Sequence, residues 1–218
     1  MNGGSIMHVF VRLVFVAAVS VVAVGCGGSS TPQKSAAPSP QRASASATMD
    51  AAVHAALQQR MSAAGTFAGE HASPPTIESG DAFIAGDNDA GEAAAFRSEH
   101  LRGAAVQHAT VPGADDSLRL ILAFPDAQSA QADSRRAIKA GPAGSNPKIF
   151  AIPGIPGAQG NELVGPDGVA HGINAIFTVG PFEYIVGVAP TSGAAHAPTR
   201  IEVSAVAVAW YHRVGSIS

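Results

Sequence analysis

Few residues of this chain have types and spacings that could support chemistry, and Cys26 is the first of them. It is the only cysteine among the 218 residues, so neither a disulfide nor a cysteine-based zinc or redox site can form within the chain. Any reaction at this thiol must therefore concern Cys26 alone, and the folded part must depend on its apolar core for stability.

Two further segments have spacings that resemble known sites, and both fail on context. Ser145 and Lys148 have the S-x-x-K spacing of penicillin-binding enzymes, but a proline lies between them and neither companion motif, S-D-N or K-T-G, occurs. The acidic segment 87–92 resembles part of a calcium loop, but placing Gly91 at its sixth position puts Arg97 at the twelfth. We therefore expect a loop at the first segment and the N-terminal turn of a helix at the second.

The histidines and large aromatic residues show no pattern typical of a metal or ligand site. The histidines of the expected folded part lack close or i,i+4 pairing; they are His54, His71, His100, His108, His171, His196 and His212. His100 and His108 could converge across a sheet edge, although exposed or hydrogen-bonded histidines are the favoured interpretation. Trp210 and Tyr211 fit the core and rim of a helix better than a ligand platform. The sequence thus predicts no catalytic residue, no metal site and no cofactor.

An apolar leader precedes Cys26. Residues 13–24 form an apolar run of about twelve residues interrupted only by Ser20, which is the length of a signal-peptide core and well short of the roughly 20 residues that span a bilayer. Residues 23–26, Ala-Val-Gly-Cys, resemble the lipobox of bacterial lipoproteins, with alanine where leucine is usual. The resemblance implies that residues 1–25 are a helical signal peptide, removed on export, and that Cys26 is lipidated. A secreted protein with an incidental cysteine is the alternative.

Residues 26–47 are predicted to form the lipidated cysteine and a flexible linker. The segment is rich in Ser, Ala, Gly and Pro, lacks acidic residues and shows no periodic apolar pattern, so it cannot bury enough surface to offset its loss of conformational entropy. A coil of about 20 residues spans roughly 25 Å on average. We expect residues 48–218, about 170 residues, to form a single domain.

The pattern of residues 48–218 predicts an α+β fold, a mostly antiparallel sheet built from hairpins with helices packed on it. The expected helices are 49–64 (with Thr48 as N-cap and Gly65 as C-cap), 92–100, 126–140 (with Asp126 as N-cap) and 198–214; the expected strands are 104–111, 118–124, 159–164, 173–179 and 182–188. Residues 66–91 are expected to be mainly loop, and 148–152 a short apolar piece. The order is typical of ββα-type units, and the last helix, apolar nearly all round, should be largely buried.

The clearest hairpin surrounds Gly180 and Pro181. A two-residue loop with glycine first suits a type II′ turn, and it pairs Val179 with Phe182, Phe177 with Tyr184, Ala175 with Val186 and Ile173 with Val188. All eight side chains then share one face, and a slip of one residue would scatter them. Thr178 and Glu183 oppose each other on the other face, which is either covered by helices or open to a ligand or partner.

Three segments carry a resemblance to a known group. They are Phe150-Ala-Ile-Pro-Gly-Ile-Pro-Gly-Ala, Phe124-Pro-Asp-Ala before a helix, and Gly180-Pro-Phe-Glu-Tyr in the hairpin. With them, the last 100 or so residues resemble small actinobacterial cell-envelope lipoproteins, including relatives of the mycobacterial LpqN type. The resemblance implies a lipid-anchored envelope protein with a PsbP-like α/β/α sandwich; because members are mostly uncharacterised, it implies no activity.

Composition narrows the possible functions. The chain is 46% hydrophobic and only 13% charged, with a formal net charge of −3, whereas a soluble domain usually has about 25% charged residues. Without clustered Lys and Arg, nucleic-acid binding is disfavoured. We expect a protein anchored by lipid to the extracytoplasmic face of the cell membrane, whose domain binds an envelope protein or an apolar ligand without catalysis. The alternative is a hydrolase-like envelope enzyme whose serine, histidine and carboxylate converge only in three dimensions.

Overall fold

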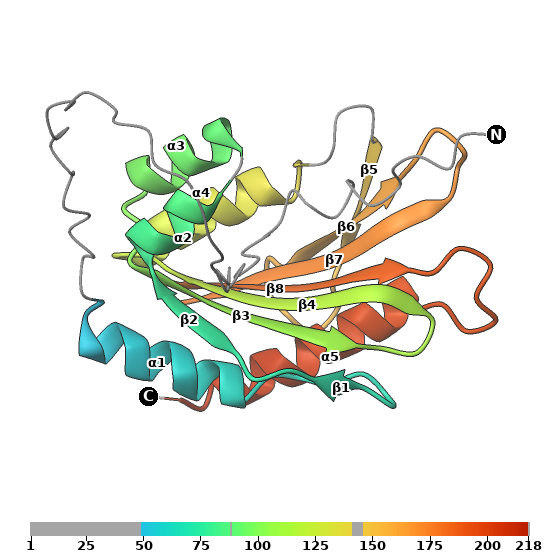
Figure 1. Ribbon diagram of the computed structural model, residues 1–218, viewed down its shortest axis with the longest axis horizontal. Coiled ribbons are helices and arrows are strands. Elements are labelled where there is room, and N and C mark those ends of the chain that lie inside the picture. The colour runs from blue at the N-terminus through green and yellow to red at the C-terminus, as the bar shows by residue number, and fades with distance from the viewer. Residues whose placement is uncertain (1–48, 88, 141–145, 218) are drawn as a thin grey trace, which may run out of the picture.

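Eight strands form one antiparallel sheet in the computed structural model, which describes residues 49–87, 89–140 and 146–217 (Figure 1). The strands are β1 (His71–Ala72), β2 (Thr76–Ser79), β3 (Gly103–Thr110), β4 (Ala114–Ala123), β5 (Asn146–Ala151), β6 (Gln159–Val164), β7 (Ala170–Val179) and β8 (Phe182–Pro190). Their order across the sheet is β1-β3-β4-β8-β7-β6-β5, and β2 also pairs with β3.

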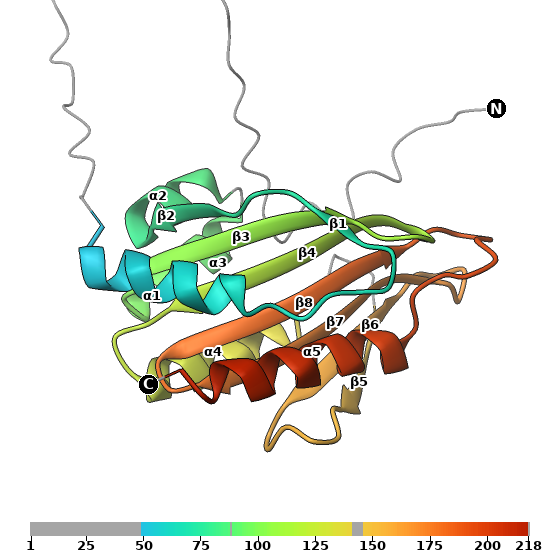
Figure 2. The ribbon, with the colours of Figure 1, turned by 90° about the horizontal axis from the view of Figure 1, so that it is seen from below.

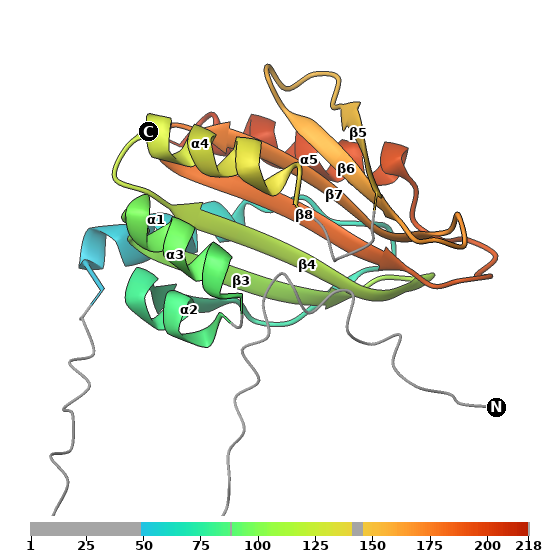
Figure 3. The ribbon, with the colours of Figure 1, turned by 90° about the horizontal axis from the view of Figure 1, so that it is seen from above.

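Helices cover the sheet as two separate layers. They are α1 (Ala51–Ser62), α2 (Gly80–Gly86), α3 (Ala90–Ser98), α4 (Ala127–Ala137) and α5 (Arg200–Val214). The α1 and α5 helices lie on one face (Figure 2), and α2, α3 and α4 lie on the other (Figure 3). Each layer encloses its own apolar cluster against the sheet. The expected α+β fold is thereby confirmed, while the expected signal peptide, linker and Cys26 lie outside the described residues.

The hairpin expected at Gly180 joins β7 and β8 in the expected register. The observed partners include Val179 with Phe182, Phe177 with Tyr184, Ala175 with Val186 and Ile173 with Val188. Gly180 has a φ of +57°, the left-handed value that the first position of a type II′ turn requires. The other face of the hairpin, which carries Thr178 and Glu183, is covered by α4, so the choice between a covered and an open face is settled in favour of cover.

An aromatic cluster fixes α5 to this hairpin. The rings of Phe177 and Tyr184 are stacked with centroids 4.7 Å apart, and Trp210 of α5 meets Tyr184 edge-on at 5.2 Å. Trp210 is fully buried, and its indole Nε1–H donates a hydrogen bond to the Arg60 carbonyl oxygen at 3.0 Å, which ties α1 to the same cluster. The expected roles of Trp210 in the core and Tyr211, half-buried, at its rim are confirmed.

The expectation that residues 66–91 are mainly loop is wrong. The segment contains β1, β2 and α2, because both short strands add to the outer edge of β3 and the Ser79 side chain then caps α2 by accepting a hydrogen bond from the Ala82 amide. The strands β1 and β2 have only two and four residues, and their conformation is set by pairing with β3. The sequence pattern of so few residues could not have predicted these strands.

Two expectations near the end of the chain need correction. The piece 148–152 belongs to a strand, β5, which pairs with β6 and forms one edge of the sheet. The last helix is buried only on the face toward the sheet, and Ile201 in its first turn is 82% exposed. Its near-continuous apolar character is therefore not matched by burial on all sides.

The helix caps follow local side-chain chemistry. Asp126 caps α4 as expected, accepting a hydrogen bond from the Ser129 amide at 2.8 Å. For α1 the observed cap is Asp50, while the expected cap Thr48 lies outside the described residues. For α5 the cap is Thr199, which forms a capping box with Glu202, so the helix begins after Pro198 and not at it.

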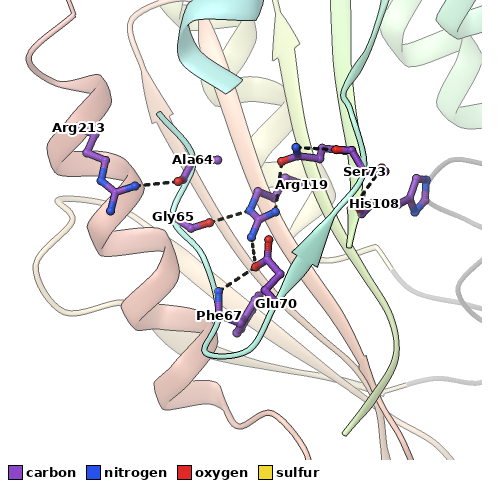
Figure 4. A network of polar contacts seen from close by, with 9 residues as sticks. Ala64, Gly65, Phe67, Glu70, Ser73, His108, Arg119 and Arg213 are labelled. Atoms are coloured by element: carbon purple, nitrogen blue, oxygen red, sulfur yellow. Dashed lines mark hydrogen bonds and ion pairs between the residues drawn. The ribbon is translucent and has the colours of Figure 1, made fainter. Parts of the chain in front are cut away.

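A buried ion pair holds the segment after α1 against the sheet (Figure 4). The side chains of Arg119 on β4 and Glu70 are 1% and 2% exposed, and Arg119 Nη2 donates to Glu70 Oε2. Arg119 Nε also donates to the Gly65 carbonyl oxygen at 2.8 Å, and Glu70 Oε2 accepts from the Phe67 amide at 2.8 Å. Arg119 thus links the loop to the sheet through both side-chain and main-chain contacts.

Arg119→Met should lower the free energy of unfolding by about 3–5 kcal/mol, because it leaves the Glu70 carboxylate buried without its cation. The double variant Arg119→Met/Glu70→Leu should recover most of that loss, since it removes both charges. Urea denaturation measures each variant. Arg200→Met, which breaks the more exposed ion pair with Glu162, is the control and should cost less than about 1 kcal/mol. A double variant as unstable as the sum of its two single variants would contradict this account.

Candidate ligand-binding groove

A groove opens where the sheet extends beyond the first turn of α5. Its volume is about 550 Å³, within the roughly 300–1,000 Å³ typical of small-molecule sites. Its lining comes from β6, β7, the loop after β8 and the start of α5; it consists of Glu162, Val169, Ala170, Ile173, Pro190, Thr191, Ser192, Gly193, Ala194, Ala197, Pro198, Thr199, Arg200 and Ile201. Most of these side chains are apolar, and the groove is open to solvent along its length.

Exposed apolar side chains are concentrated at this groove. Among the described residues the large hydrophobic side chains that are exposed are Ile201 (82%), Ile149 (47%) and Val169 (39%). Two of these three, Ile201 and Val169, line the groove, and the buried Ile173 also contributes to its lining. Grouped apolar exposure of this kind marks binding surfaces more often than single exposed residues do.

An ion pair crosses the groove between β6 and α5. Arg200 Nε donates to Glu162 Oε2 at 2.8 Å, and Nη2 donates to the same oxygen. The Arg200 guanidinium also lies over the Phe150 ring, 5.5 Å from its centroid. The pair fixes the first residue of α5 to the sheet and cancels the charge of both groups, so the groove presents no net charge from these two residues.

The loop that forms one wall of the groove is held by the turn between β3 and β4. The Thr191 amide donates to the Gly113 carbonyl oxygen at 2.9 Å, and the Thr191 hydroxyl donates to Asp115 Oδ1 at 2.6 Å. Gly113 has a φ of +76°, and a Cβ there would lie 2.1 Å from the His196 carbonyl oxygen. Only glycine permits both this conformation and this close approach.

Two histidines form pairs with carboxylates, and neither pair has the geometry of a nucleophile activated by a base. His108 Nδ1 lies 3.4 Å from Asp116 Oδ1, and this hydrogen bond raises the pKa of His108. The nearby Ser73 hydroxyl donates to the main-chain carbonyl oxygen of His108 at 2.9 Å, not to its ring (Figure 4). His171 Nε2 lies 3.2 Å from Asp167 Oδ1. A base that activates a serine must accept the hydroxyl proton itself.

The other residues singled out in the sequence lie apart from one another in the structure. His100 precedes β3 and His108 lies near its far end, so the two do not converge. The histidines other than His171, which is half-buried, are exposed within the described ranges.

Lys148 lies in a strand, not at the start of a helix, while Ser145 lies outside the described residues. Asp89 caps α3, as expected of the acidic segment. Within the part of the chain that the structure describes, no three His, Cys, Asp or Glu side chains are grouped to hold a metal.

Sequence reasoning did not find the groove. Its lining residues come from two separated stretches, 162–173 and 190–201, and most are Ala, Gly, Pro, Ser or Thr. One signal was available: Ile201 is an isoleucine in the first turn of a helix, two residues after the cap, where polar residues are usual. Comparisons of the chain with protein-family models, with curated proteins and with solved structures found no match.

Gly113→Ala should destabilise the protein well beyond the cost of its backbone conformation, because the new Cβ meets the His196 carbonyl oxygen. Gly157→Ala is the matched control: Gly157 has a similar φ of +75° and nothing within 4 Å of the added Cβ. We expect about 1 kcal/mol for Gly157→Ala and at least twice that for Gly113→Ala in urea denaturation. Equal losses of unfolding free energy in the two variants would show that the close contact of Gly113 with the His196 carbonyl oxygen does not restrict the residue at position 113.

Proposed function

We propose that this protein is a lipoprotein anchored through Cys26 to the extracytoplasmic face of the cell membrane, and that its domain binds an apolar ligand without catalysis. The observation that carries the ligand-binding part is the groove, with its apolar lining and the exposed Ile201 and Val169. The resemblance of residues 23–26 to a lipobox supports the anchor. The expected grouping with small actinobacterial envelope lipoproteins is part of the same proposal.

The chemistry of the groove favours an uncharged ligand. Arg200 and Glu162 neutralise each other, so a charged ligand would have to break an existing ion pair to gain a new one. Apolar area removed from water contributes about 25 cal/mol per Å². Because the groove is open, only part of a chain-like molecule such as a neutral acyl lipid would be buried. The entropic cost of association offsets part of the free energy gained by burying this apolar area. We therefore expect a dissociation constant of about 1 μM.

The position of the groove is compatible with attachment by the N-terminal segment. The described residues begin just before α1, whereas the groove lies at the start of α5. The starts of α1 and α5 lie toward opposite ends of the sheet (Figures 1 and 2). A linker over residues 26–47 would therefore leave the groove accessible. An envelope protein that inserts an apolar side chain into the groove is the competing occupant, and ligand-binding measurements distinguish the two.

Ile201→Asp should weaken binding of the neutral fluorescent probe Nile red at least about tenfold, because it places a charge on the apolar rim. The folded structure should persist, since Ile201 is exposed and aspartate is favourable in the first turn of a helix. Ile149→Asp is the control, because Ile149 is exposed on β5 and does not line the groove. Fluorescence titration measures both, and a neutral monoacylglycerol should compete with the probe.

Equal Nile red affinity in the wild type, Ile201→Asp and Ile149→Asp would overturn the ligand-binding proposal. Two results together would favour an envelope protein as the occupant of the groove. Nile red would bind without being displaced by a monoacylglycerol, and the groove would crosslink to a membrane protein.

Mass spectrometry of the mature protein should show Cys26 as the N-terminal residue with acyl chains attached, and Cys26→Ala should leave the membrane fraction. Two or more acyl chains bind a bilayer far more firmly than one, so the wild type should resist extraction with salt. An unmodified thiol at Cys26 in the mature wild-type protein would refute the anchor and leave the ligand-binding proposal unaffected.

A further inference from the structure

One carboxyl group is buried on the face of the sheet opposite to α5, where α4 packs on β7 and β8. Figure 3 shows the helices of that face, α2, α3 and α4. Glu183 of β8 is 0% exposed, and neither of its carboxyl oxygens has a hydrogen-bond partner among the described residues. It lies opposite Leu122 of β4 and Thr178 of β7 in the sheet. Burial of an ionised carboxylate without partners is strongly unfavourable, so this position calls for a neutral acid.

The cation whose charge opposes the rise in the pKa of Glu183, Arg136, already pairs with other carboxylates. Arg136 of α4 bonds to Asp133 of the same helix, and its Nη2 donates to Glu99 Oε2 at 3.3 Å at the end of α3. Its guanidinium also lies over the Phe96 ring of α3, 5.2 Å from the centroid. Arg136 thus joins α3 to α4. Its positive charge is already balanced by Asp133 and Glu99, so it compensates little of the charge of an ionised Glu183.

The electrostatic balance around Glu183 favours its protonated form. Burial raises the pKa of Glu183 well above its ordinary value; Arg136 opposes this effect, while the charges of Glu99 and Glu92 on α3 add to it. Burial also raises the pKa of Glu99, against Arg136. On the opposite face of the sheet, burial raises the pKa of Tyr184 to about 12, so that group does not titrate between pH 6 and pH 9.

We propose that the α3–α4 layer is a proton-controlled cover over the sheet: it stays closed while Glu183 carries its proton, and loss of that proton opens it. The reason is that an ionised Glu183 must reach water, and α4, which packs on β7 and β8 and is joined to α3 through Arg136, lies over the strand that carries it. Opening would expose apolar side chains of the cluster on that face, including Leu120, Leu122 and Ile185.

The sign of the pH dependence follows from linkage. The pKa of Glu183 is higher in the closed state than its ordinary value of 4.5. The proton therefore stabilises the closed state fully when the pH is below 4.5. This stabilisation is lost as the pH rises toward the pKa that Glu183 has in the closed state. Because one proton is involved, the open population should grow by up to about tenfold per pH unit in that range.

Hydrogen–deuterium exchange of the full chain, read by mass spectrometry from pH 6 to pH 9 and corrected for intrinsic exchange rates, tests the proposal. Protection in α3 and α4 should fall as the pH rises, by up to about tenfold per unit, while α5 stays protected. Glu183→Gln should abolish the slope, because the amide has a similar shape and does not titrate. Glu162→Gln on β6, at the groove, is the control and should keep the slope.

Three results would overturn the proposal: no slope in the wild type, the same slope in Glu183→Gln, or loss of protection in α5 in parallel with α4. Glu183→Leu is the second non-titrating variant, to be used if the glutamine variant does not fold. It too should show no slope in α3 and α4.

Discussion

The packing of Trp210 against the stacked rings of Phe177 and Tyr184 is the interaction on which the rest of the structure depends. It places α5 on the β7–β8 hairpin, and through the Trp210 hydrogen bond to the Arg60 carbonyl oxygen it places α1 beside α5. Burial of aromatic side chains of this size removes a large apolar area from water. Because these contacts hold the C-terminal half of α5, its first turn lies away from them, where it contributes to the groove.

The two faces of the sheet handle buried charge in opposite ways. On the face of α1 and α5, Arg119 and Glu70 are buried together, and main-chain groups of Gly65 and Phe67 also form hydrogen bonds with them. On the other face, Glu183 is buried with no such partner among the residues that the structure describes. A paired buried charge fixes a segment in place, whereas an unpaired one makes the fold sensitive to its protonation. The first face is therefore the structural one, and the second is the one that can respond to conditions.

The groove lies where β7, β8 and α5 begin or end. No single element forms it: β6 and β7 provide one wall, and the loop after β8 provides the other, held by the close approach of Gly113 to His196. Its residues are small or apolar, and the ion pair between Arg200 and Glu162 fixes its shape without giving it a charge. Such a surface suits binding by shape and apolar contact, in keeping with the proposed binding of an apolar ligand.

The sequence by itself determined the elements whose patterns are long and regular. The hairpin register follows from eight apolar residues at period two, and the cap of α4 follows from Asp126, because in both cases neighbouring residues along the chain carry the information. The resemblance of residues 23–26 to a lipobox is likewise local; it stays a prediction, because these residues lie outside the described ones. Only the tertiary structure decided the rest. The strands β1, β2 and β5 take their conformation from the strands beside them. The groove joins residues far apart in sequence, and the burial of Glu183 depends on α4 lying over it. Pairing and burial across such distances are properties of packing, which local patterns do not record.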